Sequence, residues 1–136
     1  MEIIGKDINV LPVADDVYID MTLYRDVTFV GVNAAGETWT LTEQKADGSG
    51  DQVLATIERY LVTATNGAAW QELTQAAAST VVTTASQDVV AIHVDAIELS
   101  ENYTQVKLTS TGAGTVFAIA HGLRYPRTPA NMPAMV

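Results

Sequence analysis

Two side chains of this sequence can exchange protons near neutral pH, His93 and His121. His93 alternates with the apolar residues of Val90–Val94, which places it on the opposite face of a strand. His121 stands where the last predicted strand ends, and a pH-sensing role there is the alternative to a structural one. Nucleophilic catalysis would need a serine held beside such a base. The serines lie in predicted loops or strand ends without a G-x-S-x-G motif, namely Ser49, Ser79, Ser86, Ser100 and Ser110. We therefore predict no catalytic residue and expect a protein that is not an enzyme.

Clustered carboxylates are a second candidate chemistry, because paired acids support glycoside hydrolysis and hard cations bind oxygen ligands. The adjacent acids at residues 15–16 fall in a predicted extended segment that would not fix their geometry. Asp95, Glu98 and Glu101 gather near one turn, and Asp47–Asp51 forms an acidic glycine-containing loop. Neither has the D-x-D-x-D-G pattern of a calcium loop, and no glycine loop has the setting that cradles a phosphate. We interpret both as solvated loops and predict no metal and no cofactor.

Two tryptophans, Trp39 and Trp70, could stack on sugar rings if their side chains were exposed. Tryptophans of a β-sandwich more often fill the core. The sequence leaves both interpretations open for each of them.

The last sixteen residues differ chemically from the rest of the chain. Residues 121–136 contain three of the four prolines and two of the seven cations, with no acid. Proline fixes φ and removes a backbone donor, so this segment is predicted to be neither helix nor central strand. Its arginines could pair with carboxylates of a neighbouring chain or simply be solvated. We interpret it as an extended arm that docks on a partner through Leu123, Arg124, Tyr125, Pro126, Arg127, Met132 and Met135.

Composition narrows the class of protein. A chain of 136 residues is predicted to form one domain, and the absence of cysteine excludes disulfides and cysteine metal sites. The formal net charge of −9 argues against nucleic acid, which requires clustered cations. The longest apolar runs are too short to span a bilayer, and the N-terminus does not have the pattern of a signal peptide. We expect a protein made in the cytoplasm that binds neither nucleic acid nor membrane.

The elements that must position these residues are short strands, because valine and threonine are abundant and several segments alternate with period two. One stretch, Thr74–Ala78, is predicted as a single helical turn. The strands are predicted at Val17–Tyr24, Val27–Val32, Glu37–Gln44, Gln52–Thr63, Trp70–Leu73, Thr80–Thr84, Asp88–Asp95, Tyr103–Thr109 and Thr115–His121.

Regularly spaced short strands with turns between them predict an all-β fold, an antiparallel β-sandwich or jelly-roll-like single domain. We assign residues 17–122 to this domain. Residues 1–16, which show little periodicity and contain Pro12, are assigned to an N-terminal arm, and residues 123–136 to the C-terminal arm.

Several of these segments resemble decoration or cement proteins of tailed bacteriophages, small structural proteins encoded near the major capsid protein. The resemblance covers mostly the C-terminal half and has a weaker counterpart around the two tryptophans. The segments that carry it are Val89–Asp95, Glu98–Leu99, Tyr103–Leu108 and Thr115–Ala130, with Trp39–Thr42 and Trp70 as the weaker ones.

The resemblance implies a non-enzymatic protein on the capsid exterior of a virion, with the major capsid protein as its partner. It also implies association with itself, as a homotrimer or alternatively as a dimer, with arms that reach across subunit boundaries. Two other functions stay open from the sequence. One is a carbohydrate-binding or receptor-binding β-module on a virion, and the other is a head–tail joining or tail structural protein.

Overall fold

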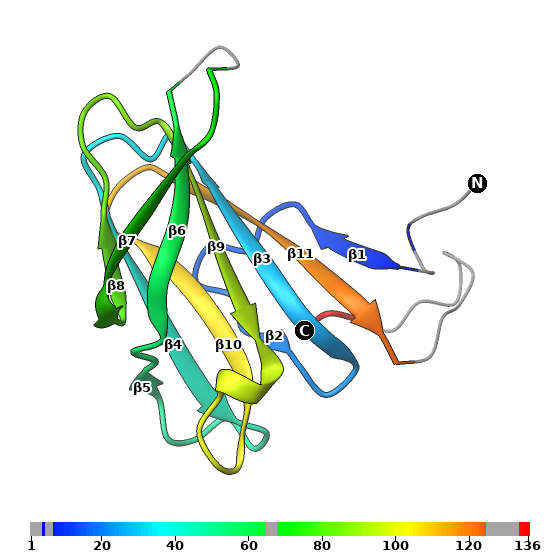
Figure 1. Ribbon diagram of the computed structural model, residues 1–136. Helices are drawn as coiled ribbons and strands as arrows, with labels where there is room; N and C mark the ends of the chain where they lie inside the picture. Colours follow the sequence, from blue (N-terminus) through cyan, green and yellow to red (C-terminus); the bar gives the residue numbers. More distant parts are fainter. Residues whose placement is uncertain (1–3, 5–6, 65–67, 125–133) are drawn as a thin grey trace.

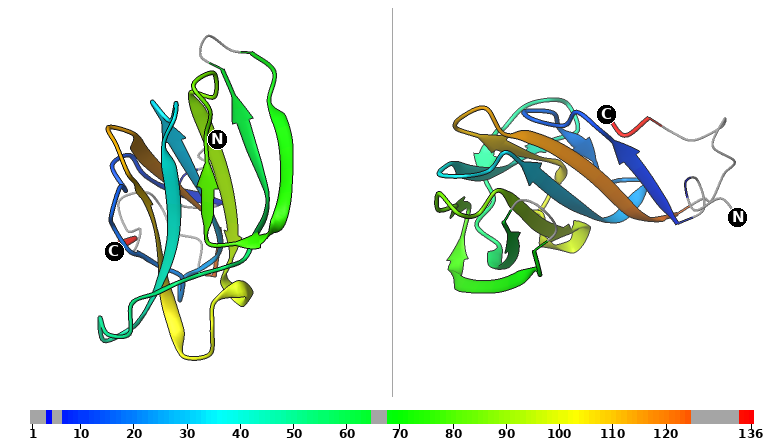
Figure 2. Two further views of the ribbon diagram at one scale, coloured as in Figure 1. Left: turned by 90° about the vertical axis from the view of Figure 1, so that its left-hand side faces the viewer. Right: turned by 90° about the horizontal axis from the view of Figure 1, so that it is seen from above.

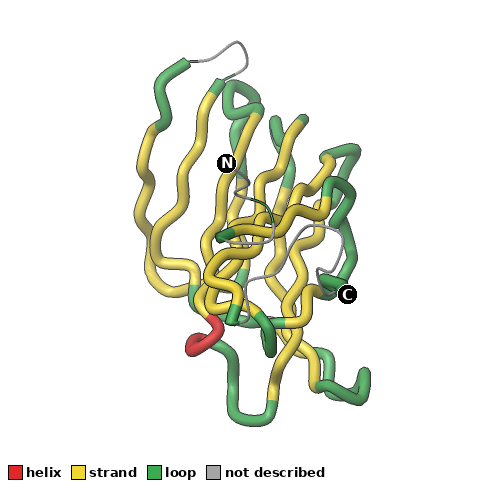
Figure 3. The backbone as a smooth tube through the Cα atoms, turned by 90° about the vertical axis from the view of Figure 1, so that its right-hand side faces the viewer, coloured by secondary structure: helices red, strands yellow, loops and turns green. Residues whose placement is uncertain are grey.

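The computed structural model of the chain describes residues 4, 7–64, 68–124 and 134–136, and these are almost entirely strand and turn (Figures 1 and 3). In the described ranges, no helix has the length and apolar character needed to cross a membrane. The elements are β1 (Ile8–Leu11), β2 (Ile19–Asp20), β3 (Tyr24–Val32), β4 (Thr38–Lys45), β5 (Gln52–Val53), β6 (Ile57–Thr63), β7 (Gln71–Ala78), β8 (Thr80–Val82), β9 (Val89–Asp95), the short 3-10 helix η1 (Ala96–Glu98), β10 (Tyr103–Ser110) and β11 (Thr115–Leu123).

The strands form two antiparallel sheets that pack face to face. Sheet A has six strands in the order β1-β11-β3-β9-β6-β7, which can be followed across Figure 1. Sheet B has the order β2-β10-β4-β5, and β8 also pairs with β4. The prediction of an all-β domain built from two antiparallel sheets is confirmed.

The core lies between the sheets and follows the alternation of the strands. In β9 the buried residues are Val90, Ile92 and Val94, while the residues between them face outward. Sheet B contributes Trp39, Leu41 and other fully buried side chains from β4 and β10. Period-two burial of this kind arises because successive side chains of a strand point to opposite faces.

Three predicted elements differ from the structure. The predicted helical turn over Thr74–Ala78 is wrong, because these residues continue β7 and pair with β6. Alanine and glutamine favour a helix, so pairing with β6 overrides the local preference of these residues. The predicted strand Gln52–Thr63 is divided into β5 and β6 around the buried Leu54.

Within the predicted strand Val17–Tyr24, Ile19–Asp20 form β2 and Tyr24 begins β3, and the residues between them form a turn. The backbone N–H of Thr22 donates to the Asp20 carboxylate at 2.9 Å. This local bond closes a turn, and the backbone then enters β3.

Part of the segment assigned to an N-terminal arm lies in sheet A. β1 pairs with β11 from Ile8–His121 to Leu11–Ala118. The N–H of the buried Ala14 donates to the Val116 carbonyl at 2.8 Å. Residues 8–14 are therefore held against the domain by backbone hydrogen bonds.

Candidate functional site

The outer face of sheet A is built from residues that face away from the core on β1, β11, β3, β9 and β6. Because directly paired residues of neighbouring strands share a face, the registers order this surface in rows. Each row crosses the strands from β1 or β11 toward β6. The first row contains Ile8, His121, Asp26 and Asp95, and the second contains Val10, Ile119, Thr28 and His93. A third row runs Phe117, Val30, Ala91, Leu61, Glu72, and a fourth runs Thr115, Val32, Val89, Thr63.

The middle of this surface is apolar. We call Val10, Ile119, Phe117, Val30, Val32, Val89, Ala91 and Leu61 the apolar face. Leu61 is 38% exposed and Val10 is 37% exposed, and the others are half-buried. An antiparallel sheet with one face in water usually alternates apolar inward and polar outward residues. Here both faces of β11 are apolar over Val116–Ala120, which is the pattern of a strand that meets a second surface.

At the polar end of this surface, the Thr28 hydroxyl lies between the two histidine rings. The Thr28 Oγ1 lies 3.1 Å from the His93 Nδ1 and 3.1 Å from the His121 Nε2. The two rings are 6.4 Å apart between centroids and tilted by 50°. A hydroxyl has a single proton to donate, so with both rings neutral it donates to one and accepts from the N–H of the other. The two tautomers are therefore coupled through Thr28.

A nearly buried carboxylate lies beside this histidine pair. The Asp26 Oδ2 is 3.2 Å from the Arg25 Nε and 3.9 Å from the His93 Nε2. Its Oδ1 is buried and has no hydrogen-bond partner among the described residues. The Asp26 side chain is only 10% exposed, so Arg25, and His93 when protonated, offset its charge.

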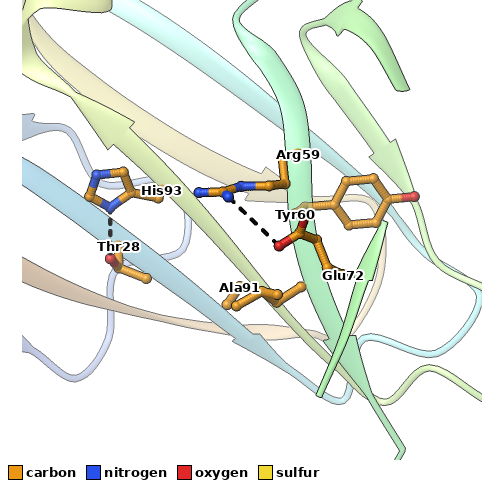
Figure 4. A pocket seen from close by; sticks show the side chains of 7 residues that line it. Thr28, Arg59, Tyr60, Glu72, Ala91 and His93 are labelled. Carbon is orange, nitrogen blue, oxygen red and sulfur yellow. Dashed lines mark hydrogen bonds and ion pairs between the residues drawn. The ribbon is translucent and has the colours of Figure 1, made fainter. Parts of the chain in front are cut away.

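A shallow hollow of about 310 Å³ opens next to the histidine pair, between β3, β9, β6 and β7 (Figure 4). Arg59 and Glu72 form an ion pair of 3.7 Å over its rim, and both side chains are largely exposed. The other residues that line it are Thr28, Tyr60, Leu61, Ala91 and His93. Apolar groups and opposite charges in one shallow depression fit side chains of another protein surface better than one enclosed small molecule.

The residues predicted to form the C-terminal arm are placed as follows. Leu123 is the last residue of β11 and is buried, and Met135 is buried as well. The Met135 carbonyl accepts a hydrogen bond of 2.8 Å from the N–H of Asp20, at the free edge of β2. Arg124 is exposed, and its N–H donates to the Leu23 carbonyl at 3.1 Å. The remaining predicted contacts lie outside the described residues, namely Tyr125, Pro126, Arg127 and Met132.

The tryptophans, which the sequence left undecided, have different environments. Trp39 is fully buried in β4 and faces the core. Trp70 is 50% exposed and directly precedes β7. Only Trp70 could therefore present its ring to a ligand.

The acidic candidates are engaged by local hydrogen bonds. Asp95 and Glu98 form a capping box at η1, since the Asp95 side chain accepts from Ile97 and Glu98 accepts from the Asp95 N–H. In the Asp47–Asp51 loop, hydrogen bonds from Ser49 lower the pKa of the Asp47 carboxyl. In the described part of the chain, no group of three or more histidine, aspartate or glutamate side chains could hold a metal ion.

Two glutamates that the sequence did not single out, Glu43 of β4 and Glu37 just before it, accept hydrogen bonds from neighbouring loops and strand ends. Glu43 is fully buried, and its carboxylate accepts from the Ser100 N–H at 2.8 Å, the Ser100 Oγ at 2.5 Å and the Gln52 Nε2 at 2.6 Å. Glu37 accepts from the Ser110 hydroxyl and the Gly114 N–H. The inward position of Glu43 in the alternation of β4 was the available signal, because an acid in that position needs several donors.

Neither a protein-family profile nor a curated protein sequence matches the chain. Among solved structures, the fold is similar to the crystal structure of the SPBc2 prophage-derived protein YomS, with a TM-score of 0.44 and 12% sequence identity. The similarity covers 84% of this chain and 87% of that chain. Both similarity values are low, so a function for this chain depends on its own surface and sequence.

Proposed function

We propose that this chain is a non-enzymatic structural protein of a tailed-bacteriophage virion. In this proposal it is made in the host cytoplasm, binds the outer surface of the capsid and reinforces the lattice of the major capsid protein. The strands β9, β10 and β11 carry most of the sequence resemblance on which the phage assignment rests. The resemblance supports the class of protein, and the surface supports the mode of binding.

The single observation that carries the proposal is the apolar face of sheet A. A contiguous apolar patch with a polar border is typical of a protein–protein contact. On one side of the apolar face, His93, His121 and Asp26 form this polar border. A sheet also presents its side chains on a rigid backbone, which lowers the entropy lost on docking. The net charge of −9 favours a partner surface that carries basic residues around its apolar contact.

The test is co-sedimentation with capsid shells that lack the protein. We would compare Leu61→Asp and Val10→Asp, which add a charge to the apolar face, with Val53→Asp. Val53 is 59% exposed on β5 of sheet B and provides a matched exposed valine away from that face. A charge buried without a partner weakens an interface by roughly 2 kcal/mol or more, or about thirtyfold. We expect this loss for the first two variants only, and undiminished binding by folded Leu61→Asp and Val10→Asp protein would contradict the proposal.

The proposal includes association of the protein with itself, as a homotrimer or a dimer. Several linked subunits bind a repeating lattice with greater avidity than one subunit, because each later contact is intramolecular. The mass of the free protein in solution is the direct measurement.

A second candidate function is binding of a carbohydrate or receptor on a host surface, and the exposed Trp70 favours it. Sugar rings stack on exposed aromatic faces, and such stacking changes the emission of the indole. Host glycans should then alter the fluorescence of the protein but not of Trp70→Phe. The fully buried Trp39 serves as the internal reference, and a Trp70 signal unchanged by glycans would argue against this function.

A further inference from the structure

One hydroxyl on β3 lies between two titratable rings that belong to different strands. β3 lies between β11 and β9 in sheet A, so Thr28 has His121 on one side and His93 on the other (Figures 1 and 2). Among the described residues, the His93 Nδ1 and the His121 Nε2 are the hydrogen-bond partners of the Thr28 hydroxyl. The other ring nitrogen of His93, the Nε2, is 3.9 Å from the Asp26 Oδ2. A row of polar groups therefore runs from Asp26 through His93 and Thr28 to His121.

The Asp26 carboxylate selects one arrangement of protons in this row when both rings are neutral. A bare His93 Nε2 would present its lone pair to the negative carboxylate, so the Nε2 carries the proton and the Nδ1 is bare. The bare Nδ1 accepts the hydroxyl proton of Thr28. The Thr28 oxygen in turn accepts from His121, whose Nε2 has to carry its proton. Both neutral rings are therefore Nε2–H tautomers.

Protonation of His93 reverses the hydrogen bonds beyond it. The added proton binds at the Nδ1, so His93 then donates to Asp26 from one nitrogen and to Thr28 from the other. Thr28 turns its hydroxyl proton toward the His121 Nε2, which has to be bare to accept it. The Nε2 proton of His121 is released to solvent and another proton binds at its Nδ1. The net change is one proton taken up, with a change of tautomer on a different strand.

His93 takes the first proton, because it is the ring beside a carboxylate. Its Nε2 forms an ion pair with Asp26 on protonation, whereas His121 forms no ion pair within the described residues. Asp26 has one buried oxygen without a partner among the described residues, and Arg25 contacts only the other oxygen. A second proton on His121 would place two cations 6.4 Å apart between ring centroids and would aim two donors at Thr28. The second proton is therefore bound in a separate step, at a lower pH.

The other charged groups around His93 do not reverse this order. The guanidinium of Arg59 points toward His93 across the hollow and opposes the proton (Figure 4). Its side chain is 70% exposed and paired with Glu72, so solvent and that carboxylate offset its charge. A second hollow of about 240 Å³ on the other side of His93 adds three acids, namely Glu58, Asp95 and Glu98. On the far side of His121, the paired residue of β1 is the uncharged Ile8.

We propose that His93, Thr28 and His121 form a pH-sensitive switch at the polar border of the apolar face. Uptake of one proton by His93 adds a positive charge to this border and moves the proton of His121 from the Nε2 to the Nδ1. The switch is a property of the free chain. Its effect on docking rests on the proposed function, because a partner surface that carries basic residues binds the more positive border less tightly.

The switch is tested by nitrogen NMR of the imidazole rings in the free, full-length chain, from roughly pH 8 to pH 5. The Nδ1 and Nε2 chemical shifts report which nitrogen carries the proton. We expect His121 to pass through a neutral Nδ1–H form while His93 becomes protonated. Thr28→Ser retains a hydroxyl and should retain this form, whereas Thr28→Val should abolish it. The proposal is overturned if His121 changes directly from the neutral Nε2–H form to the imidazolium, or if the Nδ1–H form persists in Thr28→Val.

Control of docking is tested separately, by co-sedimentation with capsid shells at roughly pH 7.5 and 5.5. His93→Gln cannot take up the proton and reports the pH dependence of all other groups, including those of the capsid. The affinity of the original chain should fall about 2- to 5-fold more over this range than that of His93→Gln. Equal losses would show that the switch does not control docking. Absence of capsid binding at both pH values would overturn the proposed function and the control of docking, while NMR would still decide the switch.

Discussion

The indole of Trp39 on β4 lies directly against Gly31 on β3, across the interface between the two sheets. A Cβ added at Gly31 would lie 2.6 Å from the Trp39 Cη2 and Cζ3 and 3.0 Å from the Val90 Cγ1. No carbon atom fits at that distance. The absence of a side chain at Gly31 therefore makes room for the largest core residue.

Gly31→Ala should destabilise the domain by about 1–3 kcal/mol, because the extra methyl forces the ring or a strand to move. Chemical denaturation measures this change in the free energy of unfolding. Trp39→Phe removes the atoms that would clash, so the double variant should lose less than the sum of the single ones. Strictly additive losses would show that the ring and the glycine are not coupled.

Glu43→Ala should lower the free energy of unfolding by about 1–3 kcal/mol, because the Ser100 and Gln52 donors lose a buried acceptor. Glu43→Gln keeps an acceptor oxygen in a side chain of the same shape, so its free energy of unfolding should fall less than that of Glu43→Ala. Glu58→Ala, at an exposed glutamate of β6, is the control and should change stability little. Equal effects at both positions would mean that Glu43 does not hold the loop at Ser100.

The ionisation of Tyr18 should make the stability of the domain fall at high pH, because its surroundings disfavour the charged form. Burial, and next the negative charge of Asp51, raise the pKa of Tyr18 to about 12. An unfolded tyrosine ionises near pH 10, so between roughly pH 10 and 12 the unfolded state holds fewer protons at this site. The stability that Tyr18 contributes is thus complete below pH 10 and is lost as the pH rises toward 12. Phenolate absorbance should show one tyrosine that titrates late, and Asp51→Asn should move it earlier. An unshifted titration in Asp51→Asn would contradict this cause.

Removal of residues 124–136 should leave a folded β-domain of lower stability that no longer binds capsids. The loss of binding is the expectation for a docking arm, and the loss of stability follows from the burial of Met135. Met135→Ala separates the two effects and should lower stability by about 2 kcal/mol or more. Val136→Ala, at the neighbouring residue that is 65% exposed, should be nearly neutral. If the truncated protein bound capsids as tightly as the full chain does, the proposal of a docking arm would be wrong.

Thr28→Val keeps the shape of the side chain but removes the hydroxyl between the histidines. Two hydrogen bonds on the surface contribute little each, so stability should fall by about 1 kcal/mol or less. The imidazole nitrogen chemical shifts of His93 and His121 should both change, because their tautomers are no longer coupled. A change confined to one ring would show that the hydroxyl serves only that histidine.

The local sequence was sufficient for most of the strands and for the side chains that face the core. Val90, Ile92 and Val94 alternate with His93, and an extended backbone turns that alternation directly into two faces. The same reasoning failed at Thr74–Ala78, where alanine and glutamine favour a helix over a strand. Only pairing with β6 selects the strand there.

The tertiary structure decided which strands are neighbours, and with them the candidate site. His93 and His121 belong to strands that do not pair with each other, and β3 lies between them with Thr28 in reach of both. It also decided that Trp39 fills the core, Trp70 is exposed and β7 forms an open edge. The alternation of a strand specifies which side chains share a face, but the choice of partner strand depends on packing between residues far apart in the chain. For that reason the sequence determined the class of fold and the two faces of its strands, and the arrangement of the surface depended on the folded chain.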